Sequence, residues 1–329
     1  MLRHASTYIL LLLCSLPLAH HAQQLPHSLR LADLPLTYNA AAFPTTNTHR
    51  LLLRCQNQFI GGRTDLSNNA AVTYHSAPFS KKQNWAIGFH ALRDKAQDFY
   101  QTNIRAGIGV RLIDRRPTRK ERITWNLGGF WGAIFSRFNH DRTQIAEEGD
   151  PVLAVTNNLN ELDAGIGTLF QYIDGKTELT LGASLVQIPQ NWSSNGERGI
   201  NRDPHLYFTA TALFPLAPGL RGGPAFSGHF MQRGDLGLPD YIRESIDHGN
   251  DRQEFVEVGL RVRLDEYESG AYAGYRHDAE SFITGFDIVL LSKAKNRQGL
   301  SLAVHFGIPF GEASNLGPTG EVGLLWEWR

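Results

Sequence analysis

Apolar and polar residues alternate with a period of two along much of this chain, and this spacing places successive side chains on opposite faces of a β-strand. The segment 103–112 shows the pattern clearly, because one of its rows is aliphatic and the other carries arginines and glycines. A soluble β-sandwich also has a polar face, but that face looks out to water and the apolar face into a core. The apolar row is Ile104, Ala106, Ile108, Val110 and Leu112, and the polar row is Asn103, Arg105, Gly107, Gly109 and Arg111.

The alternation recurs in other segments and predicts about fourteen strands, an even number as in bacterial outer-membrane barrels. Many segments reach the roughly 9–11 residues of a tilted transmembrane strand, whereas soluble strands average about 5–6. The sequence therefore predicts an all-β fold, an antiparallel transmembrane β-barrel in the bacterial outer membrane. The other predicted strands lie near 50–59, 68–78, 84–93, 122–138, 162–172, 177–188, 205–214, 223–232, 256–264, 269–276, 281–292, 300–308 and 319–328.

The connections between these strands alternate in length, as the short periplasmic turns and longer extracellular loops of such barrels do. Long stretches at 139–161, 189–204 and 233–253 each follow an odd-numbered strand. Even-numbered strands are followed by compact links, such as 173–176 with its Asp-Gly pair, a good hairpin turn. Both termini are therefore expected in the periplasm.

The N-terminus has the features of a secretory signal peptide, and we predict that it covers residues 1–22. Arg3 supplies a positive start, residues 8–18 form a short apolar core, and Ala22 is a suitable cleavage point. Leu13 before Cys14 does not fit a lipidation motif, and Cys55 then remains as a single cysteine, too few for an intramolecular disulfide or a thiolate cluster. The expected organisation is a periplasmic segment 23–49, which the sequence leaves open as a lumen plug, followed by the barrel at 50–329.

Charge is balanced, with 32 lysines and arginines against 32 aspartates and glutamates, which argues against nucleic-acid binding. The two signs separate along the chain. This separation suggests the hypothesis that basic periplasmic turns dock an acidic partner, with solvated turns as the simpler interpretation. The basic turn residues are Lys81, Lys82, Arg115, Arg116, Arg119, Lys120, Lys293, Lys295 and Arg297, and the acidic loop residues are Glu147, Glu148, Asp150, Asp235, Asp240, Glu244, Asp247 and Asp251.

No motif of specific chemistry is present, so we expect no enzyme, catalytic residue, metal site or cofactor. His90, His229 and His305 stand alone on predicted strands, where a lumen or girdle position is the expected role. Asp247, Asn250, Asp251 and Glu254 do not follow the spacing of a calcium loop and are expected to form a hydrated acidic loop. The strand glycines allow tight curvature and close backbone approach, or alternatively leave space for a lumen ligand. They are Gly107, Gly109, Gly128, Gly129, Gly165, Gly167, Gly182 and Gly259.

Several short motifs, in this order, resemble the PorP/SprF membrane proteins of the type IX secretion system over nearly the whole mature chain. The segment 38–43 is similar to that family's early Asn-Pro-Ala-Tyr-Ala-Gly segment without its proline and glycine. The closing 317–322 is similar to Thr-Gly-x-x-His-Glu-Ile without the histidine. The other motifs are 54–59 (Arg-Asn-Gln-Trp strand), 75–79 (His-x-Pro-like turn), 149–151 with 157–167 (Asp-Pro loop and Gly-rich strand), 181–188 (Gly-Leu-Ser-Val strand) and Tyr275-Arg276.

This resemblance implies a barrel that supports secretion or surface attachment of a cognate exported protein, linked to gliding motility. Its partners would be type IX components on the periplasmic side, the secreted surface protein, and outer-membrane lipid. The alternative is a solute or fatty-acid transport barrel of about fourteen strands, in which lumen arginines select solutes. The candidate selecting residues are Arg105, Arg111, Arg261 and Arg263. A lipid-modifying barrel enzyme would need an acid–base pair near the membrane rim, and the sequence names none.

Overall fold

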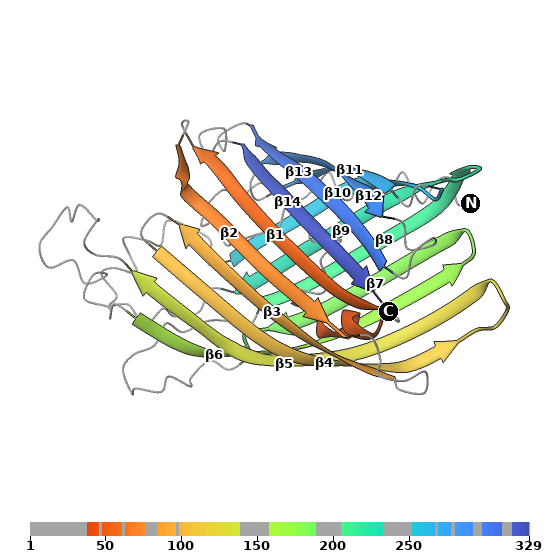
Figure 1. The fold of residues 1–329 in the computed structure, drawn as a ribbon, viewed down its shortest axis with the longest axis horizontal. Coiled ribbons are helices and arrows are strands. Elements are labelled where there is room, and N and C mark those ends of the chain that lie inside the picture. The colour runs from red at the N-terminus through yellow and green to blue at the C-terminus, as the bar shows by residue number, and fades with distance from the viewer. Residues whose placement is uncertain are drawn as a thin grey trace, which may run out of the picture.

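A computed structural model describes residues 38–45, 48–60, 63–76, 84–96, 99–138, 158–188, 205–232, 252–266, 269–277, 280–291, 298–310 and 318–328. These residues form fourteen antiparallel strands, each paired with its neighbour in sequence, and the pairing of the first strand with the last closes the sheet into a barrel (Figure 1). The predicted fold class and the predicted strand number are confirmed. A signal peptide at 1–22 lies outside the described residues.

The strands run from 8 residues in β11 to 18 in β5. Their bounds are β1 His49–Ile60, β2 Arg63–His75, β3 Trp85–Ala96, β4 Phe99–Arg115, β5 Glu121–Phe138, β6 Asn158–Asp174, β7 Thr177–Val186, β8 His205–Ala217, β9 Leu220–Gln232, β10 Arg252–Leu264, β11 Ser269–Arg276, β12 Ser281–Leu291, β13 Gln298–Pro309 and β14 Thr319–Trp328. A short 3₁₀ element, η2, covers Ala40–Thr45.

Some strands are longer than the alternation predicts. β4 begins at Phe99, although its clear alternation starts at residue 103, and it continues past a register shift between Arg111 and Ile113. The added residues lie outside the apolar band, where polar side chains are tolerated on both faces while the backbone ladder continues. The pairing of the backbone therefore extends beyond the part of the strand that the side-chain pattern reveals.

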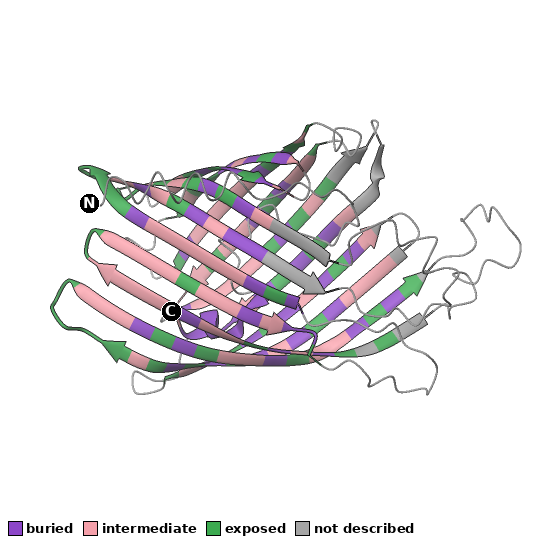
Figure 2. Cartoon of the chain, turned by 180° about the vertical axis from the view of Figure 1, so that it is seen from behind, coloured by how far each residue is buried: buried purple, intermediate pink, exposed green. Residues whose placement is uncertain are grey.

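Buried and exposed positions alternate along the strands (Figure 2). The exposed large hydrophobic residues have the parity of the outer face. Leu260 is 65% exposed and Ile166 is 61% exposed, whereas Asn126 and Arg54 are 0% and 3% exposed on the inner face. Closing the sheet satisfies every strand edge, which is the condition for crossing a bilayer with strands. An apolar exterior, a polar interior and closure together identify this chain as an outer-membrane β-barrel.

Aromatic side chains gather on the outer face at the end of the barrel where β1 begins and β14 ends. His49 stacks on Trp328 with ring centroids 5.4 Å apart, Tyr74 lies 6.3 Å from His49, and Trp326 packs 4.8 Å from Trp328. Aromatic girdles of this kind mark the membrane–water interface. The last strand, predicted at 319–328, thus contributes Trp326 and Trp328 to the periplasmic girdle.

The short described connections, including Asp174–Thr177 and the turn between Ala217 and Leu220, lie at this same end of the barrel. Gly175 has a φ of +44°, so the predicted Asp-Gly hairpin turn is confirmed. In the β4–β5 turn Arg115, Arg116, Arg119 and Lys120 are all exposed, as expected for solvated turn residues. The other basic turn residues and the acidic loop residues named above lie outside the described part of the chain.

No helix among the described residues has the length and apolar character that a membrane-crossing helix requires.

A charge placed on the outer face should destabilise the barrel according to its depth. Ile166 is at the middle of β6, so we expect Ile166→Arg to lower the free energy of unfolding in liposomes by about 2–4 kcal/mol. Gln298→Arg, at the periplasmic start of β13, is the matched control and should cost about 0–1 kcal/mol. Urea unfolding followed by tryptophan fluorescence measures both. Equal costs at the two positions would contradict the assignment of the apolar outer face to lipid.

Candidate functional site in the barrel lumen

Residues 38–45, here called the plug segment, lie inside the barrel against the inner faces of β3 to β6. Ala41 is fully buried, and Phe43 is 4% exposed. Asn39 organises the turn, because its Oδ1 accepts a hydrogen bond from the Ala41 N–H at 3.0 Å and its carbonyl accepts one from Ala42 at 3.1 Å. The barrel begins at His49, one residue before the predicted boundary, and the described part of the preceding segment is in the lumen.

Glycines on the inner face make room for the plug segment. A Cβ at Gly128 would overlap the backbone of Ala40 and Ala41, and a Cβ at Gly88 would overlap the ring of Phe43. Absent side chains therefore allow close approach of the backbone, which is one of the two roles expected for Gly128 and the other predicted glycines, and the approaching group is the chain's own segment. Gly88 was not among the predicted glycines. The cradle consists of Gly88, Gly107, Gly109, Gly128, Gly167 and Gly182.

The other predicted glycines serve the wall itself. The ring of Phe130 covers Gly165, and the ring of Tyr272 covers Gly259. Gly129 is on the outer face, because its strand neighbours Gly128 and Phe130 face the lumen. Gly129, Gly165 and Gly259 therefore do not make room for the plug segment.

Two side chains, Asn39 and Arg111, hold the plug segment at its ends with three hydrogen bonds. The Asn39 amide donates to the backbone carbonyls of Thr168 at 2.9 Å and Ala183 at 3.2 Å, bridging β6 and β7. At the other end the Arg111 guanidinium donates to the carbonyl of Pro44. Both anchors join the segment to wall groups that are distant in sequence, so its position depends on the closed barrel.

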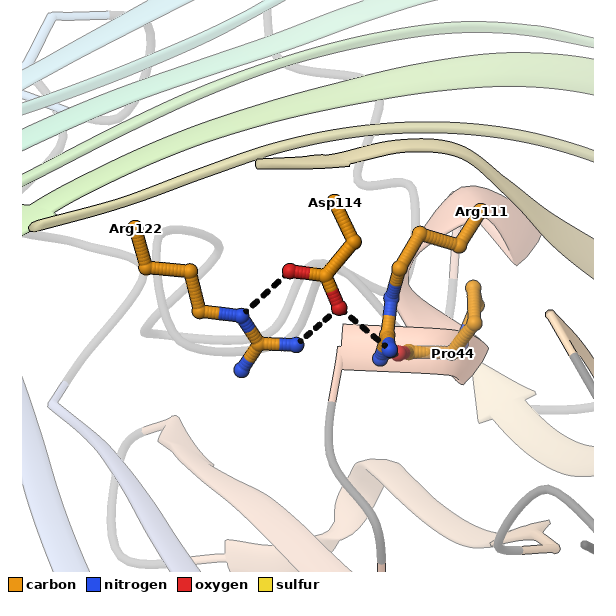
Figure 3. A network of polar contacts seen from close by, with 4 residues as sticks. All are labelled: Pro44, Arg111, Asp114 and Arg122. Carbon is orange, nitrogen blue, oxygen red and sulfur yellow. Dashed lines mark hydrogen bonds and ion pairs between the residues drawn. The ribbon is translucent and has the colours of Figure 1, made fainter. Parts of the chain in front are cut away.

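Arg111 belongs to a small ionic network at the periplasmic end of β4 and β5 (Figure 3). Its Nη1 donates a hydrogen bond to Asp114 Oδ2 at 3.0 Å. Arg122 donates two hydrogen bonds to the same carboxylate, from Nε to Oδ1 at 3.0 Å and from Nη2 to Oδ2 at 2.9 Å. Asp114 thus pairs with two arginines, which leaves the group with a net positive charge, and orients Arg111 toward Pro44. Since each oxygen of Asp114 already accepts a bond from Arg122, the carboxylate stays held even without Arg111.

Aromatic contacts complete the seat of the plug segment. Tyr38 stacks on Tyr207 with centroids 4.4 Å apart, and Phe43 lies parallel to the ring of His75 at 6.1 Å. Burial raises the pKa of Tyr38, partly offset by the positive charge of Arg54 nearby. The Tyr38 hydroxyl is therefore neutral at physiological pH.

All four arginines predicted to face the lumen do so. Arg105 pairs with Asp163, 2.5 Å between Nε and Oδ2, and its guanidinium carbon sits 4.6 Å from the centroid of the Phe130 ring. Arg261 lies 3.9 Å from Asp287. Arg111 binds the plug segment, and Arg105 binds the wall beside it. Arg261 and Arg263 are half-buried on β10, in the part of the wall opposite the plug segment.

Sequence reasoning also missed a fifth inner-face arginine, Arg276, and the carboxylate that pairs with it. Arg276 pairs with Glu257 at 2.7 Å, and the Tyr272 hydroxyl donates to the same carboxylate at 2.7 Å. Glu257 stands in the polar row of its strand, so the alternation does indicate its face. The pairing itself was not predictable, because the two partners meet only through strand register.

Arg54 differs from the paired lumen arginines. It is 3% exposed, and none of its three guanidinium nitrogens has a hydrogen-bond partner among the described residues. Buried guanidinium groups are normally satisfied by protein, water or a bound ion. Arg54 is therefore the inner-face group best suited to meet an anion that enters the lumen, and sequence analysis did not single it out as a site residue.

The predicted lone histidines are on the inner wall where they can be described. His90 Nδ1 lies 2.8 Å from the hydroxyl of Thr73, and His305 lies 3.9 Å from Glu321. The side chain of His229 and the cluster 247–254 are outside the described side chains. Among the described residues, no three His, Cys, Asp or Glu side chains are grouped closely enough to hold a metal ion.

No protein-family model matches this chain, and no curated protein matches it in sequence. Similar solved structures include the toluene transporter TbuX of Ralstonia pickettii, with a TM-score of 0.44 and 9% identity over 90% of this chain and 93% of that one. The toluene transporter TodX of P. putida has a TM-score of 0.44 and 10% identity over the same shares. A FadL homologue of Pseudomonas aeruginosa has a TM-score of 0.40 and 8% identity over 88% and 91%. Likeness at this level leaves the barrel assignment resting on the strand pairing itself.

Proposed function

We propose that this barrel is a gated transporter that carries a small anionic solute, bearing a carboxylate or a phosphate, across the outer membrane. The observation that carries the proposal is Arg54, a buried guanidinium on the inner face without a hydrogen-bond partner among the described residues. A buried guanidinium without hydrogen-bond partners is costly, so an anion that reaches it gains a strong partner. The plug segment is the gate.

The distribution of contacts in the lumen supports this arrangement. The plug segment contacts β3 to β6, and Arg261 and Arg263 line the opposite wall at β10. A passage between the plug segment and β10 would be lined by Arg261 and Arg263 on the β10 side. A barrel of 8 strands fills its interior with side chains and one of about 16 leaves a water channel, so fourteen strands leave room for a narrow route beside the segment.

The test is solute permeation through the purified chain in liposomes and planar bilayers. We expect a small dicarboxylate to permeate faster than a cation of equal size. Arg54→Gln should lower this preference by roughly tenfold, equal to about 1.4 kcal/mol of lost attraction. Arg54→Lys, which keeps the charge, is the matched control and should retain the preference. Liposomes that remain sealed to every solute would overturn the proposal.

A role in type IX secretion is the second candidate, and a specific observation favours it. Motifs that resemble the PorP/SprF family converge on one place: the segment 38–43 is the plug segment, His75 stacks on Phe43, and Asn39 fits against Gly167 and Gly182. In this role the exposed basic turn of Arg115, Arg116, Arg119 and Lys120 is the surface for periplasmic components.

Affinity purification from detergent-solubilised outer membranes, followed by mass spectrometry, separates the two candidates. Recovery of type IX components or of one large secreted surface protein would support the secretion role. Charge reversal in the basic turn should then release the periplasmic components. A barrel recovered alone, combined with anion flux, would leave the transporter proposal standing.

A further inference from the structure

A pocket of about 900 Å³ opens at the extracellular end of β3 to β6, among the residues beside the long β5–β6 connection. Its described lining is Arg93, Tyr100, Thr102, Phe135, Ser136, Arg137 and Asn160. These residues come from all four strands. The pocket is far from the plug segment along the strands and shares none of its lining with the lumen site described above.

Strand register puts all of this lining except Ser136, which is an inner-face residue, on the outer face of the barrel. Arg93 is paired with Thr102, Thr102 with Phe135, and Phe135 with Asn160, so the four residues form one continuous row across four strands. Paired residues in a sheet point to the same face. Arg93 and Phe135 alternate with the buried inner-face residues Leu92, Asp94, Ile134 and Ser136. The row therefore faces lipid rather than the lumen.

The chemistry of the outer face changes at this level. One step toward the middle of the membrane, the next row is Ala91, Ile104, Ala133 and Leu162, which is wholly apolar. One step toward the exterior, Lys95 pairs with Tyr100, and Tyr100 pairs with Arg137. The pocket thus lies where the apolar band ends and the headgroups of the outer leaflet begin.

Three cations lie at or beside the pocket: Arg93 and Arg137 in its lining, and Lys95 next to Tyr100. Arg93 and Lys95 lie over the Tyr100 ring, with their charged ends 5.9 and 5.8 Å from its centroid. No ion pair joins either of them, or Arg137, to a carboxylate of the described residues. Asp94, the acid between Arg93 and Lys95 in sequence, is 7% exposed on the inner face. A positive surface at headgroup depth attracts anionic lipid.

We propose that this pocket binds the phosphorylated headgroup of an outer-leaflet glycolipid. The guanidinium groups of Arg93 and Arg137 hold a phosphate, for which their planar fork is suited. Thr102 and Asn160 offer hydroxyl and amide groups to the sugar. Phe135 and the apolar row beneath it pack against the acyl chains. The proposal depends on the placement of the barrel in the membrane and is independent of what the lumen carries.

The test measures retention of purified bisphosphorylated lipid A by the full-length protein in detergent micelles, using native mass spectrometry. The double variant Arg93→Gln/Arg137→Gln should bind about 30-fold more weakly, from roughly fivefold for each cation removed at the membrane surface. Lys176→Gln removes an exposed cation in the turn at the opposite end and should bind as the wild type does. Heat-modifiable migration on a gel verifies that each variant is folded.

Three results would overturn the proposal. The first is unchanged retention by the folded double variant. The second is equal retention of lipid A from which both phosphates have been removed, which would mean that acyl contacts alone hold it. The third is full competition by millimolar inorganic phosphate, which would make the pocket a site for a free anion. Loss of retention in the double variant alone, with weak competition by phosphate, supports the glycolipid site.

Discussion

Gly128→Leu is expected to expel the plug segment from its seat and raise the conductance of the barrel in planar bilayers on the order of tenfold, toward that of wider, water-filled barrels. A Cβ at Gly128 already overlaps the backbone of Ala40 and Ala41, and a leucine adds three further carbons in the same direction. The wall cannot yield, because β5 is paired on both sides along its length. Displacement of the segment is therefore the response that relieves the clash.

Gly129→Leu is the matched control, because this glycine is the next residue of β5 but lies on the outer face. A Cβ there meets Gly165 O at 3.4 Å and the Ile166 side chain at 4.0 Å, which are ordinary contacts. Conductance should stay at the wild-type level. A chain lacking residues 38–45 provides a second route to the same open state. If this deletion conducts no better than the wild type, the plug segment is not the gate.

Arg111→Gln should release the C-terminal end of the plug segment while the barrel stays folded. The variant loses the bond from the guanidinium to the Pro44 carbonyl, and hydrogen bonds to charged groups contribute about 1.5–3 kcal/mol. The released state should then be populated roughly 10 to 100 times more often. Cysteine labelling kinetics at Thr45→Cys would report the release, in a background with Cys55→Ser.

Arg122→Gln is the control for this second prediction, since both arginines bind Asp114 but Arg111 alone of the two contacts Pro44 (Figure 3). Its loss should lower the stability of the β4–β5 hairpin slightly and leave labelling at position 45 unchanged. Equal acceleration in the two variants would mean that the ionic network as a whole, rather than the bond to Pro44, positions the segment.

The transporter and secretion candidates predict different behaviour for the variants that loosen the plug segment. A gated transporter gains flux when the plug segment is loosened, because the route past it widens. A scaffold for secretion has no such flux, and its loss of function would follow the basic turn instead. Measuring conductance and partner recovery on the same two variants, Gly128→Leu and Arg111→Gln, therefore distinguishes the candidates within one set of preparations.

Local patterns in the sequence determined much of this architecture. The alternation of Ile104, Ile108 and Val110 with Arg105 and Arg111 correctly assigned the faces of β4, because side-chain direction in a strand depends only on the parity of position. The Asp-Gly pair at 174–175 correctly located a turn, because its backbone preference is intrinsic to those two residues. The resemblance to the PorP/SprF family stays a prediction.

The contacts between distant residues depend on register and closure, which no local pattern contains. Arg105 finds Asp163 across 58 residues of sequence, and Arg93 joins Asn160 in one row only through three successive strand pairings. The glycines of β3 to β6 could equally have accommodated curvature or a ligand until the barrel closed around residues 38–45. Strands, faces and turns can be predicted from local patterns, since they follow from the parity of positions and from turn chemistry. The lumen contacts and the outer pocket arise only when fourteen strands are aligned, because one residue of slip in any pairing would rearrange them.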